Sequence, residues 1–279
     1  MTTLFVEHLT TLDCAFLDSG RGLVGESWIV DIELTGTLDD QSMILDFSEV
    51  KKRLKRRIDA HSDHRLLIPQ RASELQIHAS GNDTHLHFRS AIGAIEHQSP
   101  DCAIRLIDAT EINAASVAAD LLPALKAEVP ESVAEIGLTL RPEIIDGAYY
   151  HYTHGLKKHL GACQRIAHGH RSRVDIRVDD QRSAASERAV AARWTDIYLA
   201  SREDVIAHSN GRLRVAYRAQ EGHYQLALPD THVDVLDSDT TVECIAAELA
   251  NRLRPLHPGR RVAVRAYEGV NKGAIARSA

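Results

Sequence analysis

Apolar and polar residues alternate along many short stretches of the chain, which is the pattern of β-strands with one buried face. The clearest stretch covers 27–35, where Trp28 and Val30 begin a row of apolar side chains at every second position and Gly36 follows. Other runs come in pairs around glycine-containing turns and predict β-hairpins. The predicted strands occupy 11–17, 27–35, 74–79, 84–90, 135–141, 173–178, 212–217, 223–228 and 261–266.

Helical periodicity is found in fewer places. Val50, Leu54 and Ile58 recur at every fourth position and predict a helix with a narrow apolar stripe, for which Ser48 is a favourable N-cap. Lysine and arginine fill most of its other positions, and they are most simply a solvated face. Two more helices are expected, from about 110 into the 120s and after the capping-box sequence at 240–243.

The order of these elements occurs twice: strand, strand, charged helix, hairpin, helix, strand, with a repeat of roughly 140 residues. We therefore expect a duplicated domain, with a first domain at 1–146, a second at 147–279 and the boundary near Asp146-Gly147. In the second copy the stretch 181–192 is rich in Ser, Ala and Arg and is hard to place. Antiparallel strands with helices packed on one face predict an α+β fold for each domain.

Composition excludes several classes of protein. The 279 residues are 44% hydrophobic, only 5% aromatic and carry a formal net charge of −6, which argues against a general nucleic-acid or membrane binder. No apolar run approaches a membrane span, and the N-terminus lacks the pattern of a secretory signal. Four scattered cysteines do not form a disulfide framework, so a reduced, cytoplasmic protein is expected.

The strongest chemical signal is a cysteine close to three histidines. Cys163 lies five residues before the sequence His168-Gly169-His170, and His154 lies nine residues before the cysteine. On a strand, His168 and His170 would face the same side, and His154 would join them from a neighbouring strand. Three histidines leave one position of a tetrahedral zinc ion open, as in catalytic sites. The alternative is a solvated basic loop, because the chain holds 16 histidines.

These motifs resemble the 6-pyruvoyl-tetrahydropterin and 6-carboxytetrahydropterin synthase family. In the second half the resemblance rests on the sequence 150–156, on Cys163 with the two histidines after it, and on Glu268 near the end. In the first half it rests on Gly25-Glu26-Ser27-Trp28, on Asp46-Phe47 and on the stretch from Ile58-Asp59 to Asp63-His64. The resemblance implies tandem tunnelling-fold domains, whose sheets join into a barrel with active sites between domains.

The resemblance also assigns roles to individual residues. It implies zinc ligands at His154, His168 and His170, and catalytic roles for Cys163, Asp63 and His64. It further implies that Glu268 anchors the pterin. Thr240 and Thr241 are additional candidates for pterin contact, although a helix cap is their simpler role.

Each half departs from the family pattern in a complementary way. At the metal positions the first half has Phe16, Val24 and Glu26, so no zinc is expected there. In the second half the Asp-His pair is expected at Asp204-Val205, where the histidine is missing. Each half keeps what the other lost, which favours a working site shared between the two halves.

The resemblance implies a zinc-dependent lyase acting on 7,8-dihydroneopterin triphosphate. The product is 6-carboxy-tetrahydropterin, for queuosine or deazapurine synthesis, or 6-pyruvoyl-tetrahydropterin; the motifs do not separate the two. Zinc would polarise the side-chain hydroxyls, Cys163 would take a proton as thiolate, and His64, oriented by Asp63, would shuttle protons. The alternative for Cys163 is a small buried hydrophobe, but the adjacent His168-Gly169-His170 favours the functional role. Without the resemblance, the Asp63-His64 pair is most simply part of a surface loop after the helix.

Three alternatives stay open. An aldolase-like cleavage is less favoured because residue 163 is a thiol. A non-catalytic pterin- or purine-binding scaffold would have the same fold, and so would an enzyme for another purine-like substrate. If the halves alternate around a ring, the ring holds an even number of domains, which predicts a homo-oligomer that is a dimer or a dimer of dimers.

Overall fold

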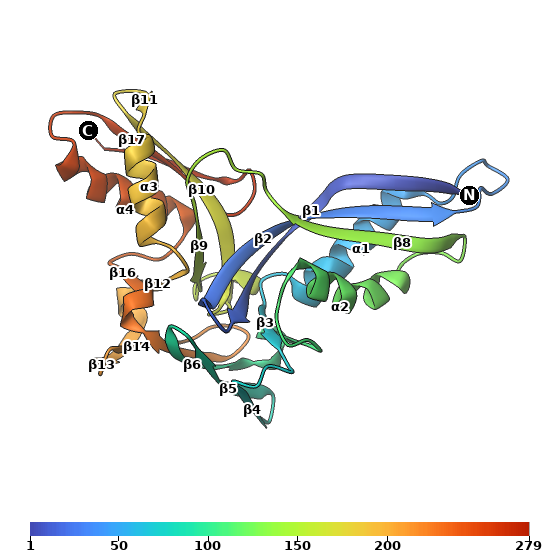
Figure 1. The fold of residues 1–279 in the computed structure, drawn as a ribbon, viewed down its shortest axis with the longest axis horizontal. Coiled ribbons are helices and arrows are strands. Elements are labelled where there is room, and N and C mark those ends of the chain that lie inside the picture. The colour runs from blue at the N-terminus through green and yellow to red at the C-terminus, as the bar shows by residue number, and fades with distance from the viewer. Residues whose placement is uncertain (279) are drawn as a thin grey trace.

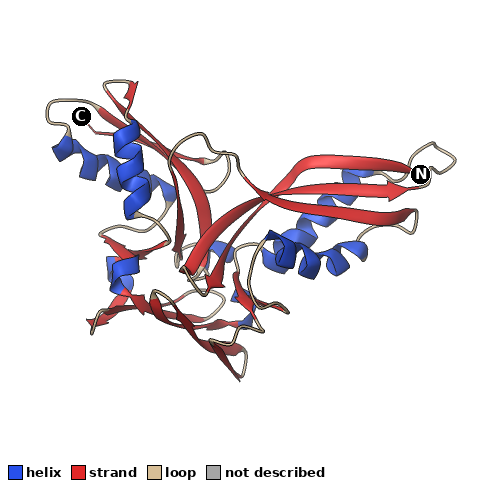
Figure 2. Cartoon of the chain, viewed as in Figure 1, coloured by secondary structure: helices blue, strands red, loops and turns tan. Residues whose placement is uncertain are grey.

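The structure is a computed structural model that describes residues 1–278, and it shows two α+β domains in tandem (Figure 1). Helices lie on one side of the main sheet of each domain, and the long strands of the two domains cross near the centre (Figure 2). The first domain contains β1 (Thr2–Asp18), β2 (Gly22–Gly36), α1 (Phe47–Ser62), β3 (Leu66–Pro69), β4 (Leu75–Ser80), β5 (Asp83–Ser90), β6 (Gly93–Pro100), β7 (Ile104–Ile107), α2 (Ala114–Lys126) and β8 (Val133–Pro142).

The second domain repeats this order and adds two strands, β11 and β18. The expected boundary at Asp146-Gly147 falls in the connection between β8 and β9. The second domain contains β9 (Tyr149–His154), β10 (His168–Val178), β11 (Gln181–Arg182), α3 (Ala184–Arg193), β12 (Ile197–Ser201), β13 (Val205–Ser209), β14 (Arg212–Arg218), β15 (His223–Pro229), β16 (Val233–Leu236), α4 (Val242–Leu253), β17 (Val262–Tyr267) and β18 (Gly273–Ser278).

The strands form three sheets, and one of them is shared by both domains. The first domain has the order β7-β3-β1-β2-β8, and the second has β16-β12-β9-β10-β17-β18 with β11 on β10. The third sheet, β13-β14-β15-β6-β5-β4, takes three strands from each domain and is continuous because β15 pairs with β6. Backbone hydrogen bonds therefore join the two domains directly.

Three apolar cores hold these layers together. One lies between the first sheet and helices α1 and α2, and it contains Phe16 and Val24. A second lies between the second sheet and helices α3 and α4, where Trp194 is fully buried. The third core fills the space against the shared sheet and contains side chains from both domains, among them Phe88 and Tyr224. Burial of apolar surface, the main stabilising contribution to folding, thus also fixes one domain against the other.

Equivalent residues of the two domains meet at their boundary. Phe16 pairs with Val24 across β1 and β2 as His154 pairs with His168 across β9 and β10, so Gly25 corresponds to Gly169. A Cβ atom built on Gly169 would lie 2.6 Å from the Cα atom of Gly25, so these equivalent glycines touch.

The same relationship holds in the shared sheet. His97 of β6 lies opposite Leu226 of β15, and each is the third residue before the proline that ends its strand. Contacts of a residue with its own equivalent are the property of a two-fold axis. The two domains are therefore related by an approximate two-fold axis that passes near these two pairs.

Several local expectations needed correction. Helix α1 is capped by Asp46, whose side chain accepts hydrogen bonds from the backbone of Ser48 and Glu49, and Ser48 is therefore already inside the helix. Thr241 caps helix α4 by accepting from the Cys244 N–H, whereas Thr240 lies just outside. The elements that the sequence did not predict include strands β6 and β13 and helix α3, the last because it lacks a strong apolar stripe. Within the described residues, none of the helices combines the length and apolarity needed to cross a membrane.

Candidate active site at the domain interface

Three buried histidines converge at the centre of the second domain. His154 is the last residue of β9, and His168 and His170 begin β10 directly opposite. All three side chains are fully buried, and one ring nitrogen from each lies within 4.8 Å of the others. The strand geometry expected from the sequence is present: His168 and His170 point to the same face, and His154 is paired with His168.

The ring nitrogens of this cluster are arranged as metal ligands require. The Nδ1 atom of His154 donates to the Thr240 carbonyl at 2.9 Å, and Nδ1 of His168 donates to the Arg165 carbonyl at 2.9 Å. A carbonyl only accepts, so both rings carry their proton on Nδ1 and keep a lone pair on Nε2. The Nε2 atoms of all three histidines are buried without a hydrogen-bond partner among the described residues. The residues therefore fit a metal ion.

Burial also sets the protonation state of two of these rings. It lowers the pKa of His154 and of His168 well below the usual value, with further lowering from the neighbouring histidines. The neutral imidazole is the form that ligates a metal.

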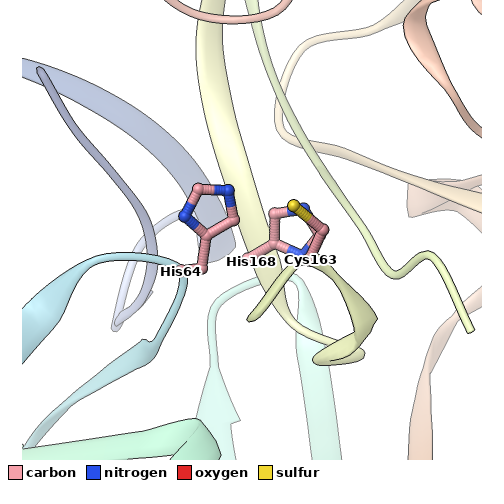
Figure 3. Close-up of side chains that lie close together, drawn as sticks. All are labelled: His64, Cys163 and His168. Atoms are coloured by element: carbon pink, nitrogen blue, oxygen red, sulfur yellow. The ribbon is translucent and has the colours of Figure 1, made fainter. Parts of the chain in front are cut away.

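The Asp63-His64 pair of the first domain lies beside this cluster. His64 follows helix α1, and its Nδ1 atom lies 2.6 Å from Oδ2 of Asp63. A ring nitrogen of His64, the Cys163 sulfur and a ring nitrogen of His168 all lie within 4.8 Å of one another, and Figure 3 shows these three side chains together. Cys163 sits in a short turn, η2 (Ala162–Gln164), between β9 and β10. His64 of the first domain thus lies beside both Cys163 and His168 of the second domain.

The environment of His64 favours its charged form. Burial opposes the charge, but hydrogen bonds to Asp63 and Cys163 outweigh burial and raise the pKa of His64 to about 10. An imidazolium next to a thiol stabilises the thiolate. The charged form of His64 thus lies beside the Cys163 sulfur and the three histidines.

Backbone contacts hold the Asp63-His64 loop in this place. His64 has a positive φ of 53°, and its N–H donates to the Asp13 carbonyl at 2.7 Å. The Asp13 N–H in turn donates to Oδ1 of Asp63 at 2.9 Å. From the second domain, Arg165 pairs with Glu221 at 3.0 Å and lies 3.5 Å from the carbonyl oxygens of Asp63 and His64.

The remaining predicted residues lie around the cluster in different roles. Glu268 follows β17, and its Oε1 atom is 4.0 Å from Nε2 of His170. Its side chain is 23% exposed, so it can reach a ligand from solvent. Thr240 is buried and its carbonyl holds His154, while Thr241 caps α4. Contact of either threonine with a pterin stays a prediction.

The counterpart of the Asp63-His64 pair is not at Asp204-Val205, as the sequence suggested. Asp204 lies in a turn after β12, where it pairs with Lys157 at 2.5 Å. The parallel pairing of β12 with β9 matches that of β3 with β1, and it places Asp196 at the position of His64. Asp196 also has the same unusual φ, 51°. The sequence assignment failed because α3, the counterpart of α1, was not recognised, so the pair was sought one strand too late.

The two-fold counterpart of the site holds different groups. Asp196, at the position of His64, accepts a hydrogen bond from Arg21 Nε at 2.9 Å and forms an ion pair with it. His151 and Glu26 face each other at 3.9 Å, in positions equivalent to Asp13 and His170. Phe16 and Val24, equivalent to the other two clustered histidines, are part of an apolar core.

Sequence reasoning missed Asp13, Arg165 and Lys272. Asp13 is 3% exposed and its Oδ1 atom lies 3.2 Å from Nδ1 of His170, with Lys272 Nζ 3.1 Å from the other carboxylate oxygen. The available signal was an acidic residue within the apolar run of 12–17. No such signal marked Arg165 or Lys272, because charged residues at loop positions are common.

A family model matches most of the chain. The model of 6-pyruvoyl tetrahydropterin synthase matches residues 18–132 and 143–279. A search of curated proteins finds no match. Among solved structures, the chain is similar to 6-pyruvoyl tetrahydropterin synthase from Plasmodium falciparum, with 17% identity over 50% of this chain and 97% of that one and a TM-score of 0.39.

It is also similar to 6-pyruvoyl tetrahydropterin synthase from Plasmodium vivax, with 19% identity over 50% of this chain and 97% of that one and a TM-score of 0.34. The family match extends over most of both halves, in agreement with the duplication of the fold. The chain belongs to the 6-pyruvoyl tetrahydropterin synthase family.

Proposed function

We propose that the chain is a zinc-dependent pterin lyase that converts 7,8-dihydroneopterin triphosphate to 6-carboxy-tetrahydropterin or to 6-pyruvoyl-tetrahydropterin. The former product would feed deazapurine and queuosine synthesis. The observation that carries the proposal is the position of His64 of the first domain, which lies beside Cys163 and His168 of the second. A proton-transfer pair next to a metal-binding cluster is what removal of a proton beside a hydroxyl requires.

The metal is proposed to be zinc, held by His154, His168 and His170. Three imidazoles whose buried Nε2 atoms have no hydrogen-bond partner among the described residues are a typical set for a catalytic zinc ion. When bound, such an ion supplies Lewis-acid polarisation of the substrate's side-chain hydroxyls.

The proton transfers are assigned to residues of both domains. Cys163 is proposed as the base, because the imidazolium of His64 stabilises its thiolate. Asp63 accepts from Nδ1 of His64 and fixes the orientation of the ring, so that the other ring edge faces the thiol. Cys163 would take the proton that leaves the substrate, and the imidazolium of His64 would donate one in return.

Substrate orientation is assigned to Glu268. A carboxylate accepts hydrogen bonds from two neighbouring N–H groups at once, which matches the amino and ring N–H groups of a pterin. The partial exposure of Glu268 and its distance of 4.0 Å from His170 support a contact next to the metal histidines. Thr240 and Thr241, at the N-terminal end of α4, are proposed as secondary contacts to the pterin.

The test is an assay of the purified protein with 7,8-dihydroneopterin triphosphate, with products separated by chromatography. Formation of either pterin, lost in Cys163→Ala with zinc retained, supports the enzyme. Binding of pterin without turnover, unchanged in Cys163→Ala, would instead support the non-catalytic scaffold. Turnover of a purine-like substrate only would show that the fold serves a different reaction.

We also propose a cytoplasmic homo-oligomer, a dimer or a dimer of dimers. Strands β8 and β18 end their sheets with one edge unpaired among the described residues, and such edges are suited to pairing between copies. Assembly is not needed to bring the two halves of the site together, since His64 already meets Cys163 within one chain. Mass measurement in solution would test the proposal, and a trimer would contradict it.

A further inference from the structure

We propose that Asp13, from the domain without metal ligands, is a positioning residue that orients His170 for metal binding and aligns the Asp63-His64 loop with it. This inference rests on the proposed zinc site but concerns a residue outside its ligand set. It gives the first domain a second contribution to the site besides the catalytic pair.

The side chain of Asp13 faces His170 from across the domain boundary. Oδ1 of Asp13 lies 3.2 Å from Nδ1 of His170, and both side chains are almost completely buried. His154 and His168 donate from Nδ1 to backbone carbonyls. Nδ1 of His170 has no such hydrogen bond among the described residues, and the Asp13 carboxylate lies within reach of it. A carboxylate at the outer nitrogen of a metal-bound histidine fixes its ring orientation and increases the basicity of the ligating nitrogen.

The carboxylate is itself held in position by further contacts. Ser27 donates its hydroxyl to Oδ1 of Asp13, and Lys272 lies 3.1 Å from Oδ2. A buried carboxylate with these partners is fixed in position, and so is the ring that it faces.

The backbone of Asp13 also contacts the catalytic loop that carries Asp63 and His64. Its N–H donates to Oδ1 of Asp63 at 2.9 Å, and its carbonyl accepts from the N–H of His64 at 2.7 Å. One residue therefore contacts a metal histidine with its side chain and both members of the catalytic pair with its backbone. This residue of β1 therefore links His170 to the proton-transfer pair.

The two-fold counterpart provides a matched control. Glu26 and His151 occupy the positions of His170 and Asp13 in the other domain, and they too face each other across the boundary. Glu26 is 8% exposed and Asp13 is 3% exposed, so both are buried. Glu26 faces His151, however, and none of the three metal histidines. Replacement of this carboxyl by an amide should therefore leave metal binding unchanged.

The experiment measures zinc affinity by chelator competition in the full chain, comparing wild type with Asp13→Asn, Asp13→Ala and Glu26→Gln. We expect zinc affinity to fall about 10-fold in Asp13→Asn and about 100-fold in Asp13→Ala, with Glu26→Gln unchanged. The absorption spectrum of the cobalt-substituted protein should change in the Asp13 variants only, since it reports ligand geometry.

The outcomes separate the two proposals. Wild type that binds zinc, with Asp13 variants of equal affinity and unchanged cobalt spectrum, would overturn the role of Asp13 alone. Wild type that binds no zinc would overturn the proposed function as well. If metal-free Asp13→Asn fails to fold, Ser27→Ala tests the same claim, because it loosens the carboxylate; a several-fold loss of zinc affinity is then expected, and no loss would overturn the inference.

Discussion

Gly25 and Gly169 are equivalent residues of the two domains, and they lie against each other where β2 crosses β10. A Cβ atom on Gly25 would come within 1.9 Å of the Tyr152 carbonyl oxygen, and one on Gly169 within 2.4 Å of the same atom. Neither position has room for a side chain, because the neighbouring atoms belong to the backbone.

Gly25→Ala should therefore separate the domains at this crossing. We expect the free energy of unfolding in urea to fall by roughly 3 kcal/mol, at the upper end of overpacking effects, because backbone must move. Gly161→Ala is the control, since a Cβ atom there meets nothing within 4 Å. Equal stability of the two variants would show that β2 and β10 are not held this closely.

His64→Ala should abolish most turnover while leaving the zinc in place. Loss of a proton-transfer group lowers kcat by roughly 10²–10⁴-fold. Asp196→Ala is the matched variant, because Asp196 occupies the equivalent position in the second domain and faces Arg21 rather than a thiol. Its turnover should stay near that of wild type. Comparable losses in both variants would contradict the assignment of one active and one inactive site.

A buried histidine near the two-fold axis, His97, should make stability depend on pH. His97 lies opposite Leu226, is 3% exposed, and its Nδ1 atom has no hydrogen-bond partner among the residues described. Burial, with a smaller contribution from His85, lowers the pKa of His97 to about 3. Between pH 6.5 and 3 the unfolded chain therefore binds a proton that the folded chain does not, and His97 makes the fold less stable as the pH falls through this range.

His97→Leu should remove this effect and make the pair with Leu226 symmetric. Relative to wild type, the variant should gain stability as the pH falls below the usual histidine pKa of about 6.5, by up to roughly 1.4 kcal/mol for each pH unit, and show no added pH dependence above it. Other buried histidines contribute equally to both proteins. Urea midpoints at about pH 8 and about pH 4.5, on either side of that pKa, measure the difference. A gain of the same size at both pH values would refute the assignment.

The sequence predicted which histidines lie together better than it predicted how the two domains join. His154, His168 and His170 form the expected cluster because strand periodicity determines which side chains share a face. The Asp63-His64 pair was identified by resemblance, and the structure brings it to Cys163. Strand pairing between β6 and β15 was not predicted, because contacts between residues far apart in sequence leave no periodic signal.

The error at Asp204 has a different cause. Helix α3 is short and lacks a strong apolar stripe, so its sequence does not mark it as the counterpart of α1, and the residues that follow it were passed over. Only the parallel pairing of β12 with β9, together with the positive φ shared by Asp196 and His64, identifies the true counterpart. Asp13 was missed because its partners, His170 and Lys272, come from the other domain.

The central claim is that one half of the chain holds the metal while the other half aligns the proton-transfer pair. Zinc content of protein purified without added metal, measured beside His168→Ala, tests it most directly. The account predicts about one zinc ion per chain in wild type and none in the variant. Two ions per chain would contradict the metal-free first domain, and a chain that takes up no zinc even on addition would contradict the metalloenzyme.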